Sequence, residues 1–177
     1  MKNNYANYYQ ISEQGKELIK ELEGFKLDVY PDAEGYSVGY GHYLGKVKPP
    51  FTRITKENAD AFFNADITRI NTALNTKLTK RDLPQNVIDA AGSFAYNLGT
   101  GMYLTTLAEH LNKGHINEAA AYMKRIIYAS GKKNETLIKR RAQEAALLLQ
   151  GAGGSLMALL FFLLVVIAIF TFLKLKK

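Results

Sequence analysis

The 177-residue sequence contains no cysteine and no tryptophan. Without cysteine, the chain can form neither disulfides nor thiolate metal sites, and the redox compartment in which it works cannot be inferred. Residues 1–18 contain no apolar stretch, so we expect no cleavable secretory signal there. The class of protein therefore has to be inferred from the charged residues and the hydrophobic residues. The hydrophobic residues make up 47% of the chain.

One long hydrophobic run lies near the C-terminus. Residues 156–173 read LMALLFFLLVVIAIFTFL, with Thr171 as the only polar side chain. As a helix this run would be about 27 Å long, close to the ~30 Å hydrocarbon thickness of a bilayer. A soluble core helix of this length almost always has a polar face. We therefore predict a transmembrane helix at 156–173, with a glycine-rich hinge at 151–155 before it and a basic tail at 174–177 after it.

The chain is basic, with a formal net charge of +7. The segment from residue 151 onward contributes three lysines and no acid, so residues 1–150 carry +4. A positive surface suits a partner with a negative surface, such as bacterial cell wall, anionic lipid or nucleic acid. The charge does not distinguish among these partners, or between them and an ordinary soluble surface.

Residues 11–150 indicate one α+β domain, mainly helical with a small β-hairpin sheet, and residues 1–10 an N-terminal extension. Ser12 is the expected N-cap of a first helix, and Gly24 is placed to end it. Two β-like runs, LDVY and YSVGY, flank the turn-forming sequence PDAEG. Hydrophobic spacing predicts further helices at 55–74, 85–99, 104–112, 117–129 and 137–150.

Two acids bracket the first β-like run. Glu23 falls in the last turn of the first helix, where the helix dipole favours the protonated carboxyl, and Asp32 falls in the predicted hairpin turn. Hydrolysis of a glycosidic bond needs an acid that protonates the leaving oxygen and a second group that directs a nucleophile. Glu23 and Asp32 are candidates for these roles, and the Ser37 hydroxyl is a candidate for holding a water. Two surface acids nine residues apart are also common, so the spacing alone does not decide.

The stretch ISEQGKELIKELEGFKLDVYPDAEGYSVGYGH resembles the opening of the phage-type lysozymes, endolysins of the muramidase kind. That family places a Glu before a Gly at a helix end, then an Asp in a hairpin turn, a Thr and a GYGH-like segment. Similar motifs follow in the same order at SFAYNLGTG (93–101), LTTLAEHLNKG (104–114) and LIKRRAQEAALLLQG (137–151). The resemblance covers residues 11–151 and implies a lysozyme-like fold.

The resemblance implies that Glu23 is the general acid, and that Asp32 stabilises developing positive charge and orients the attacking water. The family threonine falls at Ser37, but only four residues separate Asp32 from Ser37 where the family pattern has five. Serine keeps the hydroxyl and lacks the methyl group that would fix the rotamer. The water-holding role of Ser37 therefore departs from the family pattern.

Four further side chains are candidates for lining the sugar groove: Tyr36, Tyr40, His42 and Asn97. For the two tyrosines, core packing is an equal alternative. A histidine that follows glycine in a GYGH segment is also commonly a structural hydrogen-bonding residue at a strand end.

Three charged residues keep two interpretations each. Arg140 and Arg141 are either structural or paired with an acid near the cleft, as an arginine is in the family. Asp28 is expected to be solvated and is the fallback second carboxylate.

The function that the resemblance implies is a membrane-anchored muramidase. It would cleave the β-1,4 bond between N-acetylmuramic acid and N-acetylglucosamine in peptidoglycan glycan strands. The two carboxyls and water complete the chemistry, so no metal, organic cofactor or nucleic acid is expected to take part. The alternatives are a lytic transglycosylase that uses Glu23 alone, and a non-catalytic, wall-binding virion membrane protein.

The lysines of the basic tail favour a cytoplasmic C-terminus, which would place the domain across the membrane next to the cell wall. Lys139, Arg140 and Arg141 on the other side of the span weaken that prediction. The other location is the internal membrane of a lipid-containing virion, where virion membrane or capsid proteins would be partners.

Overall fold

The computed structural model describes residues 8–32 and 35–150, which contain six helices and two small antiparallel sheets. The helices are α1 (Glu13–Glu23), α2 (Lys56–Lys77), α3 (Gln85–Leu98), α4 (Met102–Asn112), α5 (Ile116–Arg125) and α6 (Glu135–Leu149). The strands are β1 (Lys26–Asp32), β2 (Gly35–Gly39), β3 (His42–Gly45), β4 (Tyr128–Ala129) and β5 (Lys132–Lys133).

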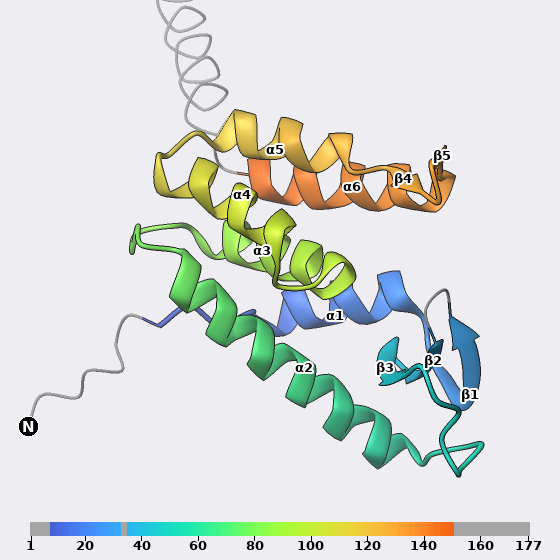
Figure 1. The fold of residues 1–177 in the computed structure, drawn as a ribbon. Coiled ribbons are helices and arrows are strands. Elements are labelled where there is room, and N and C mark those ends of the chain that lie inside the picture. The colour runs from blue at the N-terminus through green and yellow to red at the C-terminus, as the bar shows by residue number, and fades with distance from the viewer. Residues whose placement is uncertain (1–7, 33–34, 151–177) are drawn as a thin grey trace, which may run out of the picture.

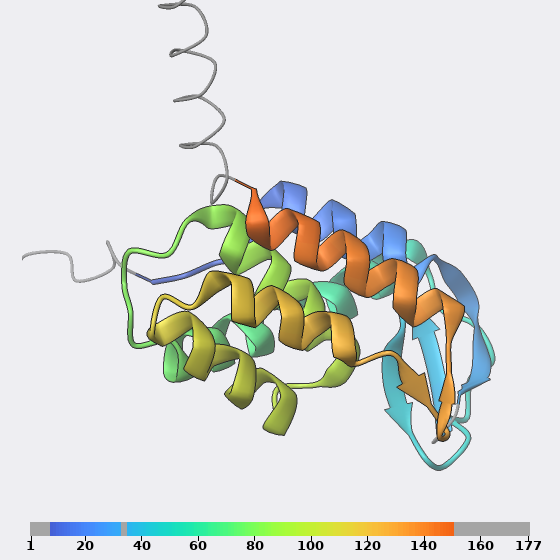
Figure 2. The same cartoon turned by 90° about the horizontal axis from the view of Figure 1, so that it is seen from above.

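The β1–β2–β3 sheet lies at one end of the molecule, beside the C-terminal end of α1 (Figure 1). The long helix α2 runs from this end to the opposite end of the helical part (Figure 1). Seen from above, the β4–β5 hairpin, which precedes α6, lies at the same end of the molecule as the sheet (Figure 2). The end of α1 that carries Glu23 therefore lies where the sheet meets the helices.

Helix α3 forms the centre of the helical part and contacts α1, α2, α4 and α6. Its residues from Val87 to Ala95 are all buried. A Cβ atom at Gly92 would lie 2.6 Å from side-chain atoms of Ile11, so the chain can pass this close only at a glycine. The helix predicted at 85–99 is thus present, and its small residues allow this close packing at the centre of the helical part.

The start of α1 is fixed to α3 by a polar contact. The Ser12 hydroxyl accepts a hydrogen bond from the Gly15 N–H at 3.1 Å, as expected of the predicted N-cap. The Ser12 N–H and hydroxyl also donate to the buried Asp89 carboxylate, at 2.7 and 2.6 Å. Because α1 is held at this end, the place of Glu23 at its other end is set by the length of the helix.

The predicted hairpin is present, with two differences. Asp32 is the last residue of β1, paired with Gly35, and not a turn residue as predicted. A third strand, β3, follows immediately and was not predicted. The connection between β2 and β3 is very short because Gly39 and Gly41 adopt φ values of +66° and +79°, which other residues rarely adopt.

The helix predicted at 117–129 is too long, because α5 ends at Arg125 and β4 begins at Tyr128. Ser130 and Gly131 have φ values of +49° and +75° and join β4 to β5. Two consecutive residues with positive φ form the tight turn that matches the twist of a β-hairpin. The apolar spacing of residues 126–129 was therefore wrongly interpreted as helical.

Within residues 8–32 and 35–150, no helix combines the length and the apolar character needed to cross a membrane. The predicted hinge at 151–155, span at 156–173 and basic tail at 174–177 lie outside the described residues. So do residues 1–7 of the predicted N-terminal extension.

Candidate active site

Glu23 is the last residue of α1, and its side chain is 17% exposed. Its Oε1 atom accepts a hydrogen bond from Arg140 Nη1 at 2.7 Å. A Cβ atom at Gly41 would lie 3.0 Å from the second oxygen, Oε2. The absence of a side chain at Gly41 therefore leaves space beside Oε2, while Arg140 occupies Oε1.

Arg140 is itself held by a buried network. Its Nε donates to Glu144 Oε1 at 3.0 Å, and its Nη2 donates to the Ser93 carbonyl at 3.2 Å. The Ser93 hydroxyl also donates to Glu144 Oε1, at 2.7 Å. With three donor groups engaged, the Arg140 guanidinium is fixed in the orientation in which it contacts Glu23.

A second buried arginine completes this network. Arg141 forms a 2.9 Å ion pair with Glu144 and donates to Asn97 Oδ1 at 2.8 Å. Burial lowers the pKa of Arg141 to about 10, which leaves it charged at neutral pH. Burial also raises the pKa of Glu144, and the two guanidiniums oppose that effect. Glu144 contacts both buried guanidiniums, and Arg140 makes a further contact with Glu23.

Asp32 lies on the sheet, near a buried serine. Alternate residues of a strand share a face, so Tyr30 and Asp32 point to the same side of β1. Ser37 lies opposite Tyr30 on β2, and its hydroxyl donates to Asp32 Oδ2 at 2.9 Å. Ser37 is fully buried, whereas Asp32 is exposed. The Ser37 hydroxyl, a candidate for holding a water, thus contacts the Asp32 carboxylate directly.

Tyr30 connects the two candidate acids electrostatically. Burial raises the pKa of the Tyr30 phenol, and the negative charges of Asp32 and Glu23 raise it further. Both carboxylates are therefore close enough to act on one phenol, although they belong to different elements. Sequence analysis did not single out Tyr30, and the only signal was its alternation with Asp32 along the strand.

Two of the predicted sugar-binding residues lie in the sheet region. The Tyr40 ring packs 4.8 Å from Phe25 and 5.3 Å from Phe63, between ring centroids, so the core-packing alternative describes it. Tyr36 pairs with Pro31 of β1 and adjoins a register shift between Tyr36 and Ser37 in the pairing of β2 with β3. A sugar-binding role for Tyr36 stays a prediction.

The other two predicted residues, His42 and Asn97, are each held by polar partners. His42 Nδ1 is 2.7 Å from Asp66 Oδ2, and the imidazole stacks on Phe62 with centroids 4.5 Å apart. The side-chain oxygen of Asn97 accepts the hydrogen bond from Arg141, so Asn97 belongs to the buried arginine network. A pocket of about 370 Å³ opens beside His42, lined by Gly41, His42, Tyr43, Asp66, Arg69 and Tyr96.

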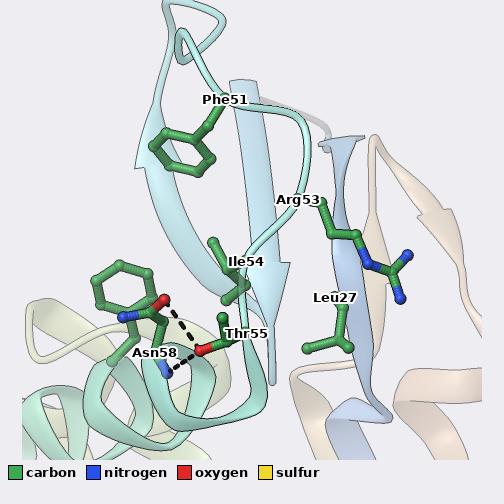
Figure 3. Close-up of a pocket in the computed structure, with 7 residues that line it drawn as sticks. Leu27, Phe51, Arg53, Ile54, Thr55 and Asn58 are labelled. Carbon is green, nitrogen blue, oxygen red and sulfur yellow. Dashed lines mark hydrogen bonds between the residues drawn. The ribbon is translucent and has the colours of Figure 1, made fainter.

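Asp28, the fallback carboxylate, lies apart from these residues. It forms a 2.7 Å ion pair with Arg53, and both side chains are more than half exposed, as the solvated interpretation predicts. Figure 3 shows Arg53 at a second pocket, of about 660 Å³, beside the N-terminal end of α2. None of the candidate catalytic residues lines that pocket.

Comparison with known proteins gives a consistent result. A family model described as phage lysozyme matches residues 20–144. The endolysin of Bacillus phage PZA is 40% identical over 135 residues, which cover 74% of this chain and 52% of that protein. A SAR-endolysin of bacteriophage PS119 is 35% identical over 121 residues, 67% of this chain and 71% of that protein.

Solved structures agree with the family match. The muramidase domain of SpmX from Asticaccaulis excentricus is 32% identical with a TM-score of 0.69, and the match covers 80% of this chain and 98% of that domain. This confirms the predicted lysozyme-like fold, and the endolysin relatives support the expected enzyme class, a lysozyme-type glycosidase. The chain spans about half the length of the Bacillus phage endolysins that it matches.

Proposed function

The chain belongs to the phage lysozyme family, and we propose that it is a muramidase that hydrolyses the β-1,4 bond between N-acetylmuramic acid and N-acetylglucosamine in peptidoglycan. The observation that carries this proposal is Glu23 at the end of α1, held by Arg140 through Oε1 with Oε2 beside Gly41, next to the sheet whose strand β1 ends at Asp32. Two carboxyl groups on different elements, able to flank one sugar, are what glycosidic hydrolysis requires.

In this proposal Glu23 is the general acid. Arg140 occupies Oε1, so Oε2, beside Gly41, is the oxygen that carries the proton to the leaving glycosidic oxygen. Arg140 orients the carboxyl group, and because Glu144 and Ser93 hold the guanidinium, that orientation is preorganised. The general acid therefore needs no rearrangement of its neighbours before it acts.

Asp32 is the second carboxylate. It stabilises the positive charge that develops on the sugar and orients the attacking water. Ser37 is buried and donates to Asp32, so we assign it a positioning role that acts through this carboxylate. Direct water-holding by Ser37, as the family resemblance implies, stays a prediction.

The pocket beside His42 is the part of the sugar groove nearest to Glu23. Gly41 contributes to its wall and also lies against Glu23 Oε2. His42 forms a rigid side of the pocket, because Asp66 and Phe62 hold the imidazole. Asn97 and Tyr36 are assigned supporting roles, Asn97 through Arg141 and Tyr36 through the sheet.

We also propose that residues 156–173 anchor the domain in a bilayer, either the host inner membrane or a virion internal membrane. The support is the uninterrupted apolar sequence of this segment. Helix α6 ends on the side of the molecule opposite to the β1–β2–β3 sheet (Figure 1). In this proposal the anchor is therefore attached to the domain on the side opposite to the β1–β2–β3 sheet, which carries Asp32.

The test of catalysis uses the full chain in mild detergent with purified peptidoglycan. The parent should clear the suspension and generate muramic reducing ends, and Glu23→Gln and Asp32→Asn should each lose activity by at least about 100-fold. Asp28→Asn is the matched control, because Asp28 is an exposed aspartate of the same sheet, paired with Arg53. Its activity should stay close to that of the parent.

The products separate the alternatives. Anhydromuramic ends, with activity that survives Asp32→Asn, would establish a lytic transglycosylase that uses Glu23 alone. A folded parent that co-sediments with peptidoglycan without cutting it would be a wall-binding protein. For the anchor, the full chain should stay with membranes after an alkaline carbonate wash, and a chain ending at residue 155 should be released.

A further inference from the structure

We propose that Arg69 binds a carboxylate group carried by the glycan substrate, and that it makes the site prefer peptidoglycan to neutral glycans. This inference rests on the proposed muramidase function, because it takes the pocket beside His42 as part of the sugar groove. It concerns a residue of α2 to which the sequence analysis gave no role.

The pocket adjoins the general acid. Gly41 lines it and lies against Glu23 Oε2, where a Cβ atom would come within 3.0 Å. Tyr96 forms another wall, and its pKa is raised first by burial and then by the negative charges of Asp66 and Glu23. Gly41 therefore connects the pocket to Glu23, and Arg69 lines the same pocket, so a substituent of a sugar held beside the acid can enter the pocket that Arg69 lines.

Asp66, the one acid that lines the pocket, is already engaged. Its Oδ2 is 2.7 Å from His42 Nδ1, and its Oδ1 is 3.3 Å from Arg69 Nη2. The Asp66 side chain is 13% exposed, so little of it faces an incoming ligand. An anionic group entering the pocket therefore meets the guanidinium and not an uncompensated carboxylate.

Arg69 keeps most of its hydrogen-bonding capacity. Its side chain is 67% exposed, and its contact with Asp66 is long and involves a single nitrogen. A guanidinium has five N–H donors in a fixed plane, and a carboxylate can accept two of them in parallel. Asp66 thus anchors the guanidinium beside the pocket and leaves donors for a second carboxylate.

The proposed substrate offers that chemistry in two places. N-acetylmuramic acid carries a lactyl branch that ends in a carboxylate when no peptide is attached, and the stem peptide carries carboxylates of its own. A polymer of N-acetylglucosamine carries neither. The ligand class is therefore a carboxylate on the muramic branch, and a neutral chitin-type glycan serves as the reference substrate.

Arg53 provides a matched control. Like Arg69, it is mainly exposed and pairs with one aspartate, Asp28, at 2.7 Å. It lines the separate pocket beside α2 shown in Figure 3, and not the pocket beside His42. Arg53→Ala removes the same charge and side chain from the surface without touching the proposed ligand site.

The experiment compares the full-length parent, Arg69→Ala, Arg69→Lys and Arg53→Ala in detergent on three polymers. These are intact peptidoglycan, amidase-treated strands that keep only lactyl carboxylates, and neutral glycol chitin. Arg69→Ala should lower kcat/KM about fivefold on peptidoglycan, mainly through KM, and leave glycol chitin unchanged. Arg69→Lys should recover only part of the loss. Lysine keeps the positive charge, but it cannot donate two parallel hydrogen bonds to a carboxylate as a guanidinium does.

The outcomes distinguish the two possible sources of the carboxylate, the lactyl branch and the stem peptide. A loss on both anionic polymers identifies the lactyl carboxylate, and a loss on intact peptidoglycan alone identifies the peptide. An equal loss on all three polymers, no loss on any, or the same loss in Arg53→Ala overturns the inference. Co-sedimentation with each polymer repeats the comparison without catalysis, so an inactive parent would overturn the proposed function while the role of Arg69 is still measured.

Discussion

Arg140 Nη1 lies 2.7 Å from Glu23 Oε1, although 117 positions separate the two residues in the sequence. The contact joins the C-terminal end of α1 to α6, the last helix of the described domain. Glu144 and Ser93 hold the same guanidinium from the other side. The orientation of the candidate acid therefore depends on correct packing of α6, and folding of α1 and the β1–β2–β3 sheet alone cannot produce it.

Replacing Arg140 with lysine should separate charge from geometry. Lysine keeps the positive charge, but one ammonium group cannot contact Glu23, Glu144 and the Ser93 carbonyl with the geometry of a guanidinium. We expect peptidoglycan-clearing activity to fall about 10- to 100-fold and the free energy of unfolding to fall by about 2 kcal/mol. Lys139→Ala, at the exposed neighbouring position, should change neither quantity, and unchanged activity in Arg140→Lys would show that charge alone is sufficient.

Gly41→Ala should disturb the acid directly. The φ value of +79° costs an alanine about 1–2 kcal/mol, and the new Cβ would lie 3.0 Å from Glu23 Oε2. Gly114→Ala is a matched control, because Gly114 has φ +73° and, among the described residues, no atom lies within 4 Å of the position that its Cβ would take. Both variants should lose similar stability, and Gly41→Ala alone should lose about tenfold in activity. Equal activities would mean that the space beside Oε2 is not used.

Ser37→Ala tests the contact between the serine and the second carboxylate. It removes the hydroxyl that donates to Asp32, and we expect about a tenfold loss of activity with a stability loss of about 1 kcal/mol. Ser37→Thr keeps the hydroxyl and restores the residue of the family pattern. Its methyl group enters a fully buried position, which should cost about 1–3 kcal/mol while activity is largely kept. Full activity in Ser37→Ala would remove Ser37 from the mechanism.

The parts of the site that sequence analysis located are those set by local structure. The place of Glu23 at a helix end was inferred from the two predicted helix caps, Ser12 and Gly24, and both caps are observed. The place of Asp32 was inferred from the turn-forming cluster beside it. The prediction put Asp32 in the turn, and the structure shows it as the last residue of the strand before the turn. Local signals of this kind need only neighbouring residues, so they can be recognised without the fold.

The parts that could not be predicted depend on contacts between distant elements. Whether Arg140 pairs with Glu23 is decided by how α1 and α6 each pack against α3, which no local pattern contains. The contact of Ser37 with Asp32 depends on strand register, because a shift of one residue would turn Ser37 to the other face. The β4–β5 hairpin depends on positive φ at Ser130 and Gly131. The apolar spacing of the residues before this turn predicted a helix instead.

The last prediction concerns stability at high pH. Burial, followed by the charges of Asp66 and Glu23, raises the pKa of Tyr96 well above its usual value near 10. Below pH 10 the phenol is protonated in both the folded and the unfolded chain, so it contributes no pH dependence. Above pH 10 the unfolded chain releases this proton and the folded chain keeps it. Unfolding therefore becomes easier by about 1.4 kcal/mol per pH unit for this one group.

Tyr96→Phe should remove that slope. At pH 8 the variant should be less stable than the parent by about 1 kcal/mol, because the hydrogen bond from the Tyr96 hydroxyl to the Tyr40 carbonyl is lost. Between pH 10 and 11.5 the difference should shrink and then change sign, since only the parent carries the extra penalty, which reaches about 2 kcal/mol at pH 11.5. Denaturant titrations of both proteins at these pH values measure the two slopes. Parallel slopes would mean that Tyr96 ionises in the folded protein as readily as in the unfolded chain.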